Sequence, residues 1–171
     1  IKVKYMNKVG IIGGSGFAGE ELIKFLSLHD FASLLAVSSR ELRSQPVAQF
    51  VEGSDLKFVD PDDEIFFDCD VVFFATPHGI SMEKAKYFIQ QGIKVIDLSA
   101  DFRIKDLTIW KDWYNSDHKD PEGVEQSVYG LTELNKDLIK GGNLIAVPGC
   151  YPTASILGLL PLLDSSFKID S

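Results

Sequence analysis

A short apolar run that leads directly into a glycine-rich turn is the feature that most constrains this chain. Residues Val9–Ile12 are followed by Gly13, Gly14, Ser15, Gly16, Phe17, Ala18 and Gly19. The glycines satisfy both G-x-G-x-x-G and G-x-x-G-x-x-G. A strand, a tight turn and a helix in this order let the backbone approach a pyrophosphate, which then meets the free N–H groups of the helix. Glycine-rich turns also occur for packing alone. Here the predicted strand before the turn and the helical pattern after it favour nucleotide binding.

The rest of the chain alternates between two kinds of apolar pattern. The runs that predict strands are Val9–Ile12, Leu34–Val37, Leu56–Val59, Val71–Ala75, Ile93–Ile96 and Leu144–Val147. Several are apolar throughout, which is typical of a parallel sheet covered on both faces. Helical patterns cover Glu20–Leu28, Ser81–Gln91 with Ser81 as its N-cap, Thr132–Lys140 and Ala154–Leu163. This order predicts an α/β fold with a doubly wound, mostly parallel sheet.

Two long polar stretches, Gln45–Gly53 and Arg103–Gln126, do not fit the alternation. Long connections in compact domains are often functional or contain short helices of their own. We therefore predict that both stretches are excursions from the sheet.

Size and charge exclude several classes of protein. The 171 residues correspond to one domain, and 17 basic against 25 acidic residues give a net charge of −8. Such a surface argues against nucleic-acid or anionic-membrane partners. No apolar stretch reaches the ~18 residues of a membrane span, and no basic-then-apolar leader is present, so we expect a cytoplasmic protein. The two cysteines lie in unlike settings, which predicts neither a disulfide scaffold nor a metal site.

The residues that follow the second predicted strand bear on the choice of nucleotide. In dinucleotide-binding domains a residue about twenty positions past the glycine turn contacts the adenosine ribose. Here Ser38, Ser39 and Arg40 occupy that place. Hydroxyls and an arginine suit a 2′-phosphate, so the sequence favours NADP over NAD. Glu41 would favour NAD if the register were shifted by one residue, and Arg40 as a solvated loop cation is the other alternative.

Cys150 follows an apolar strand and precedes a helical run in which Pro152 suits the first helical position. The positive end of a helix dipole lowers the pKa of a thiol, so this setting suits a nucleophile. A free cysteine can equally be a small buried hydrophobe, and both interpretations stay open on spacing alone. Cys69 lies between Asp68 and Asp70, whose charges would raise its pKa, and we interpret it as structural.

Five motifs, in one order along the chain, resemble the N-acetyl-gamma-glutamyl-phosphate reductases. They are Gly13–Gly19, Thr76–Gly79, Leu98–Arg103, Tyr129–Asn135 and Pro148–Thr153. The resemblance implies a Rossmann-type NADP-binding domain over residues 6–149. It also implies that residues 150–171 form the catalytic-cysteine helix and the start of a second α+β domain, which builds the substrate site and the contacts of a homo-oligomer.

The chemistry that the resemblance implies is reduction of an acyl phosphate. Cys150 would attack the acyl carbon, release phosphate and form a thioester, which NADPH reduces to an aldehyde. The glycine turn would hold the pyrophosphate, and Thr76, Pro77, His78 and Gly79 would lie near the nicotinamide, with His78 packing in that loop rather than acting as a base.

The sequence also suggests roles for four residues outside the cofactor loops. Arg103 would hold the leaving phosphate, or else form a structural pair with Asp101 or another acid. Tyr129 and Glu133 would shape the pocket wall, and His118 would be solvated surface. The general acid/base is expected beyond residue 171.

Three alternatives remain open at this stage. The substrate could be an aspartyl phosphate or a carrier-bound aminoadipyl phosphate in place of N-acetylglutamyl phosphate. The chain could also be a non-catalytic NADP-binding module.

Overall fold

The computed structural model describes residues 6–164, so the remainder of the predicted second-domain segment lies outside the described residues. The strands are β1 (Asn7–Ile12), β2 (Ala32–Val37), β3 (Val71–Phe74), β4 (Lys94–Asp97), β5 (Val128–Tyr129) and β6 (Leu144–Ala146). They form one six-stranded sheet in the order β2-β1-β3-β4-β6-β5, and all its pairs are parallel. The predicted doubly wound parallel sheet is therefore confirmed.

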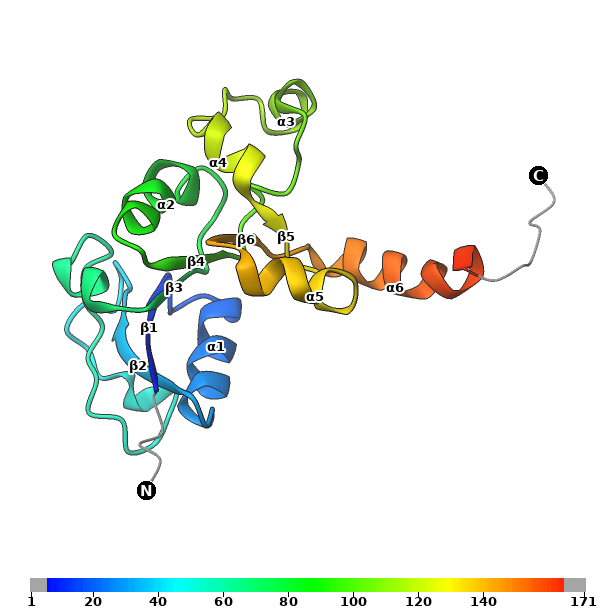
Figure 1. Ribbon diagram of the computed structural model, residues 1–171. Coiled ribbons are helices and arrows are strands. Elements are labelled where there is room, and N and C mark those ends of the chain that lie inside the picture. Colours follow the sequence, from blue (N-terminus) through cyan, green and yellow to red (C-terminus); the bar gives the residue numbers. More distant parts are fainter. Residues whose placement is uncertain (1–5, 165–171) are drawn as a thin grey trace.

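The helices lie on both faces of this sheet, as Figure 1 shows. They are α1 (Phe17–Ser27), α2 (Ser81–Gln90), α3 (Leu107–Tyr114), α4 (Pro121–Gln126), α5 (Thr132–Gly141) and α6 (Cys150–Asp164), with short 3-10 turns η1 (Val47–Gln49) and η2 (Glu64–Asp68). The chain moves from β1 to β2 in one direction and then continues from β3 in the other. Because both crossovers are right-handed, α1 and α2 cover opposite faces. The strand order reverses between β1 and β3, and ligands of such sheets bind at this point.

Two clusters of buried side chains form the core, one on each side of the sheet. The larger lies under α2 and α3 and includes Phe66, Phe74, Phe88 and Trp110. The smaller lies under α1 and is built from Ile11, Ile23, Val37, Val47 and Phe58.

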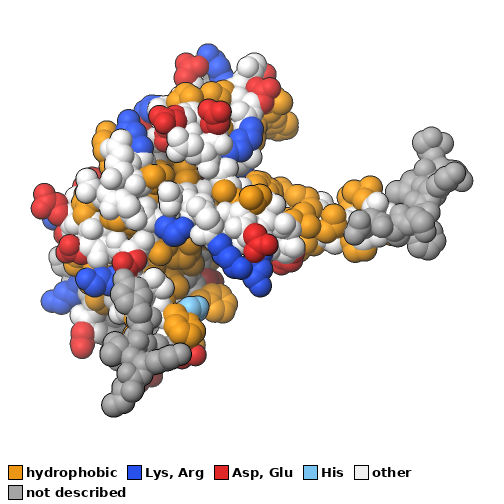
Figure 2. All heavy atoms as spheres, in the orientation of Figure 1, with side chains coloured by type: hydrophobic (Ala, Val, Ile, Leu, Met, Phe, Trp, Pro, Cys, Tyr) orange, Lys and Arg blue, Asp and Glu red, His pale blue; other side chains and the backbone are white. Residues whose placement is uncertain are grey.

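Helix α6 extends away from the sheet, and Figure 2 shows that hydrophobic side chains cover much of it. Tyr151, Leu159, Leu162 and Leu163 are among its exposed residues. None of the described helices combines the length and the apolarity that crossing a bilayer requires.

The structure corrects several predictions of local structure. Leu56–Val59 is not a strand, because its backbone forms only isolated bridges, Ser38 with Val59 and Pro46 with Lys57, while Phe58 packs into the smaller cluster. The two-residue strand β5 was not predicted. The two excursions are confirmed, since η1 lies in the first and α3 and α4 lie in the second.

Two predicted helix starts are also corrected. Ser81 is not the N-cap of α2 but its first residue, and the cap position, Ile80, supplies no side-chain hydrogen bond. Helix α6 begins at Cys150, earlier than the predicted Ala154, so Pro152 is its third residue and not its first.

Candidate active site

Three glycines of the turn between β1 and α1, Gly13, Gly14 and Gly19, leave no room for a side chain. Gly13 has φ +92, and a Cβ there would lie 2.4 Å from the Ala75 carbonyl oxygen. A Cβ on Gly19 would lie 2.3 Å from the Gly13 oxygen. Helix α1 begins after Gly16 with no side-chain cap, and its first residues, Phe17 and Ala18, expose their side chains. The first-turn N–H groups are therefore available to an anion placed over the turn.

Serine side chains from the end of β2 hold this turn in place. Gly14 N donates to the Ser38 carbonyl at 2.8 Å, and Gly13 N donates to Ser38 Oγ at 3.2 Å. Ser15 and Ser39 share a hydrogen bond of 2.8 Å between their hydroxyls. Both Ser38 and Ser39 are buried, whereas Arg40 is exposed. Of the three residues predicted at the 2′-phosphate, Ser38 thus faces the turn, and Arg40 is the one open to solvent.

A cavity of about 320 Å³ lies at the carboxyl ends of β1 and β3, where the strand order reverses. It is lined by Ile12, Gly13, Ser15, Ser39, Arg40, Glu41, Pro61, Thr76, Pro77, Ile80 and Lys84. Thr76 Oγ1 is buried on this wall and has no hydrogen-bond partner among the described residues. A turn with no room for a Cβ at Gly13, Gly14 or Gly19 and an unpartnered hydroxyl beside it both fit a dinucleotide. Sequence reasoning missed Pro61, Ile80 and Lys84, which reach the cavity only through the fold.

The Thr76–Gly79 turn is fixed by the carboxylate of Asp101, which follows β4 in the chain. Gly79, with φ +92, donates its N–H to Asp101 Oδ1 at 2.7 Å. Asp101 Oδ2 accepts from Ser81 Oγ at 2.9 Å and from Met82 N at 3.0 Å. Asp101 therefore caps α2 in place of the predicted Ser81. His78 is exposed, and its ring lies 5.1 Å from that of Tyr114.

Asp97 at the end of β4 joins this network through two serine hydroxyls. Its carboxyl contacts Ser99 N at 3.0 Å and Ser99 Oγ at 2.9 Å, and Ser99 Oγ lies 3.1 Å from Ser81 Oγ. Ser99 Oγ donates to Asp97 Oδ2 and accepts from Asp101 N at 3.2 Å. When Asp97 takes up a proton, it can donate that proton to Ser99 Oγ, and Ser99 can then donate to Ser81 Oγ.

The surroundings of Asp97 shift its carboxyl toward the protonated form. The side chain is fully buried, and burial raises the pKa of its carboxyl to about 6. The neighbouring charge of Asp101 adds to the rise, while the hydrogen bonds from Ser99 oppose it.

Cys150 lies at the same edge of the sheet, beyond β6. It is exposed and is the first residue of α6, whose first turn is closed by Thr153 N donating to the Gly149 carbonyl at 3.0 Å. An exposed thiol at a helix N-terminus is placed as a nucleophile requires. Cys69, by contrast, is buried, and desolvation followed by the charges of Asp70 and Asp68 raises the pKa of its thiol to about 11. Its structural interpretation is confirmed.

Arg103 packs against the turn that precedes Cys150. Its Nε donates to the Val147 carbonyl at 2.7 Å and its Nη2 to the Leu98 carbonyl at 2.6 Å. Its Nη1 would lie 3.2 Å from a Cβ on Gly149, so only glycine leaves that nitrogen its present place. The predicted alternative of an Arg103–Asp101 pair is wrong, because Asp101 is used by α2 and by the Thr76–Gly79 turn. The fold thus brings Arg103, at the start of the second excursion, against Gly149, the residue before Cys150.

The structure corrects the predicted role of His118 and places Glu133 and Tyr129. His118 is not solvated surface: it is half-buried, its Nδ1 accepts from Asp120 N at 3.0 Å, and its Nε2 therefore carries the hydrogen donated to the Asp101 carbonyl at 2.7 Å. Glu133 is exposed on α5, and Tyr129 lies in β5. Within residues 6–164 no three acidic, histidine or cysteine side chains are grouped to hold a metal ion.

A parallel sheet with a sterically closed glycine turn at its switch point is the architecture of a dinucleotide-binding domain. The chain matches the family described as semialdehyde dehydrogenase, NAD binding domain, over residues 8–142, and it belongs to that family.

Curated proteins include relatives with much higher identity than the solved structures. The chain is 48% identical over 164 residues to an N-acetyl-gamma-glutamyl-phosphate reductase of Nitrosospira multiformis, which covers 94% of this chain and 48% of that protein. It is equally identical, with the same coverage, to the reductase of Thiobacillus denitrificans. The chain thus spans about half the length of the curated relatives it matches.

Solved structures share the fold at lower identity. Aspartate semialdehyde dehydrogenase II from Vibrio cholerae, complexed with ASA, superposes with a TM-score of 0.71 at 19% identity, covering 94% of this chain and 47% of that one. Aspartate semialdehyde dehydrogenase with NADP from Candida albicans gives 0.59 at 18% identity, covering 93% and 47%.

Proposed function

We propose that this chain is the cofactor-binding and nucleophile-bearing part of an NADPH-dependent N-acetyl-gamma-glutamyl-phosphate reductase. The observation that carries the proposal is the exposed Cys150 at the start of α6, with the Arg103 guanidinium against the turn before it. Relatives at 45–48% identity bear this name, and this favours N-acetylglutamyl phosphate over the aspartyl and aminoadipyl alternatives.

Cys150 attacks the acyl carbon of the substrate as a thiolate, the C–O bond to phosphate breaks, and a thioester forms on Sγ. The N-terminal N–H groups of α6 and Nη1 of Arg103 stabilise the departing phosphate, because it is an anion. When bound, NADPH supplies the hydride that reduces this thioester to N-acetylglutamate semialdehyde and frees the thiolate.

The chain's own residues position the cofactor. The N–H groups after Gly16 face the pyrophosphate, Thr76 lines the cavity beside them with its hydroxyl buried and unpartnered, and Arg40 faces the 2′-phosphate. An exposed arginine at the end of β2 is the support for NADP over NAD. The relatives' other half supplies the general acid/base and the subunit contacts in this proposal.

The test uses the full-length protein and its Cys150→Ser variant in the reverse direction. Phosphate-dependent NADP⁺ reduction is followed with N-acetylglutamate semialdehyde, and with aspartate semialdehyde as the control. We expect turnover only with the first aldehyde, and its loss in the serine variant. Turnover only with aspartate semialdehyde would reassign the substrate, and tight NADP⁺ binding without turnover would support the non-catalytic module.

Arg103→Met is the companion variant. Loss of the guanidinium should raise the KM for phosphate at least tenfold, since a charged hydrogen bond is worth about 1.5–3 kcal/mol. The Kd for NADP⁺ should change little, because Arg103 does not line the cofactor cavity. An unchanged phosphate KM would remove Arg103 from the phosphate site.

A further inference from the structure

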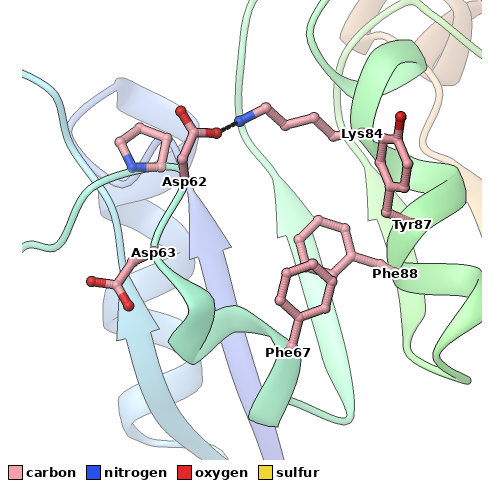
Figure 3. Close-up of a pocket in the computed structure, with 7 residues that line it drawn as sticks. Asp62, Asp63, Phe67, Lys84, Tyr87 and Phe88 are labelled. Carbon is pink, nitrogen blue, oxygen red and sulfur yellow. Dashed lines mark hydrogen bonds and ion pairs between the residues drawn. The ribbon is translucent and has the colours of Figure 1, made fainter.

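Lys84, which lines the cofactor cavity, belongs to an ion pair at the edge of that cavity. Lys84, on α2, pairs with Asp62, in the loop before η2, and Figure 3 shows the lysine reaching across to the carboxylate. The Lys84 side chain is 24% exposed, whereas that of Asp62 is 68% exposed. The lysine stem is therefore held by its surroundings, and the carboxylate is open to water.

This pair separates two cavities. Pro61 and Lys84 line the cofactor cavity, and they also line an adjoining cavity of about 210 Å³. In the second cavity the rings of Phe67 and Phe88 stack at 4.9 Å, and Figure 3 shows them below the ion pair. The two cavities thus share a wall formed by Pro61 and Lys84, and Lys84 carries the cation of that wall.

Apart from Lys84, the charged residues that line the cofactor cavity cancel one another. Arg40 and Glu41 line the cofactor cavity together, and they carry opposite charges. Arg40 and Lys84 both act on the same carboxylate, because the Lys84 hydrogen bond lowers the pKa of Asp62 and the charge of Arg40 lowers it further. The two cations are therefore neighbours around Asp62. A 2′-phosphate carries about −1.5 to −2 charges at pH 7, more than Arg40 alone can neutralise.

We propose that Lys84 is a second cation of the 2′-phosphate site and that Asp62 is its counter-ion when no cofactor is bound. NADP then exchanges the Asp62 carboxylate for its own 2′-phosphate. The exchange is favourable because the phosphate carries more charge than the carboxylate, and because Asp62 is mostly exposed and loses little when it returns to water. This inference rests on the proposed preference for NADP.

The test measures binding by calorimetry in the full-length protein, with two probes that differ only in the phosphate of interest. The probes are adenosine 2′,5′-bisphosphate and AMP. Lys84→Met should bind the bisphosphate about tenfold more weakly and AMP equally well, as expected for loss of a charged hydrogen bond. Lys86→Met is the matched control. It lies on the same helix but lines another cavity, and it should change either affinity by less than about twofold.

Asp62→Asn tests the exchange itself. Removing the competing carboxylate should tighten bisphosphate binding about two- to threefold without affecting AMP. Weaker bisphosphate binding in this variant would overturn the exchange. Equal weakening of both probes by Lys84→Met, or an effect no larger than that of Lys86→Met, would overturn the role of Lys84.

Arg40→Met keeps the two proposals distinguishable. If this variant loses the preference for the bisphosphate while Lys84→Met retains it, the NADP proposal stands and the inference about Lys84 falls. If the unmodified protein binds both probes equally, the preference for NADP falls and the inference falls with it.

Discussion

Replacing Asp97 by asparagine should raise the free energy of unfolding at neutral pH, although the site is fully buried. The asparagine Oδ1 can accept from Ser99 N, and its amide can donate to Ser99 Oγ. Ser99 then donates to Ser81, and Ser81 donates to Asp101. The variant therefore keeps every hydrogen bond that the protonated aspartic acid forms, and it cannot ionise.

The magnitude follows from the two pKa values of Asp97. The carboxyl has a pKa of about 6 in the folded protein against 3.8 without the fold. Below pH 4 it is protonated in both states and the two proteins should be about equally stable. Between pH 4 and 6 the unfolded chain ionises while the native chain holds its proton, so the stability of the unmodified protein falls. Above pH 6 the loss is complete, at about 3 kcal/mol, and the asparagine variant escapes it.

The assay is urea unfolding of the cofactor-free protein at pH 4.5 and 7.5, followed by the fluorescence of the buried Trp110. The advantage of Asp97→Asn should be small at the lower pH and full at the higher one. Asp101→Asn is the contrasting variant: Asp101 accepts from three donors, so an amide there should destabilise the protein at both pH values. An advantage for Asp97→Asn that does not grow with pH would show that the fold does not raise the pKa of Asp97, and would refute this reasoning.

Three further predictions concern the glycine turn, the two thiols and the hydrogen bonds of Lys105. Gly19→Ala should destabilise the cofactor-free protein by about 2 kcal/mol or more, because its Cβ would meet backbone. Gly16→Ala, whose Cβ would lie 4.0 Å from the nearest atom, should lose less than about 1 kcal/mol, and equal losses in urea unfolding would contradict the closed turn. Iodoacetamide at pH 8 should label Cys150 at least about a hundredfold faster than Cys69 by mass spectrometry, and comparable rates would count against an accessible nucleophile. Lys105→Met should lower the melting temperature by removing the ammonium that binds the Glu125 and Ser127 carbonyls at the end of α4, and an unchanged temperature would mean that water replaces it.

Much of the sheet could be predicted because its central strands are continuous apolar runs. β1, β3, β4 and β6 fall within one or two residues of the predicted ranges. Leu56–Val59 is a similar apolar run, but it lies outside the sheet. Its Phe58 instead packs under the glycine turn. β5 has only two residues, too few for any periodicity to show.

At the site, the turn and the helix-terminal cysteine could be predicted because both depend on local chain geometry. The role of Asp101 depends on contacts with residues about twenty positions earlier in the chain, which no spacing rule reveals. His118 lies in a polar loop and was predicted to be solvated. Its ring instead packs against Trp110 and Phe102, because the excursion folds back over the edge of α2.

The position of β6 sets an order for assembly during synthesis. β6 is made after β5, yet it lies between β4 and β5, and within residues 6–164 it is the strand with which β5 pairs. While the ribosome makes the second excursion and α5, the open edge of β4 must stay vacant for a strand that does not yet exist. The N-terminal strands can pair early, whereas β5 is recruited only when Leu144–Ala146 emerge and fill the gap. A chain that stalls before Leu144 would therefore display an unpaired strand edge, the kind of surface on which chains associate wrongly.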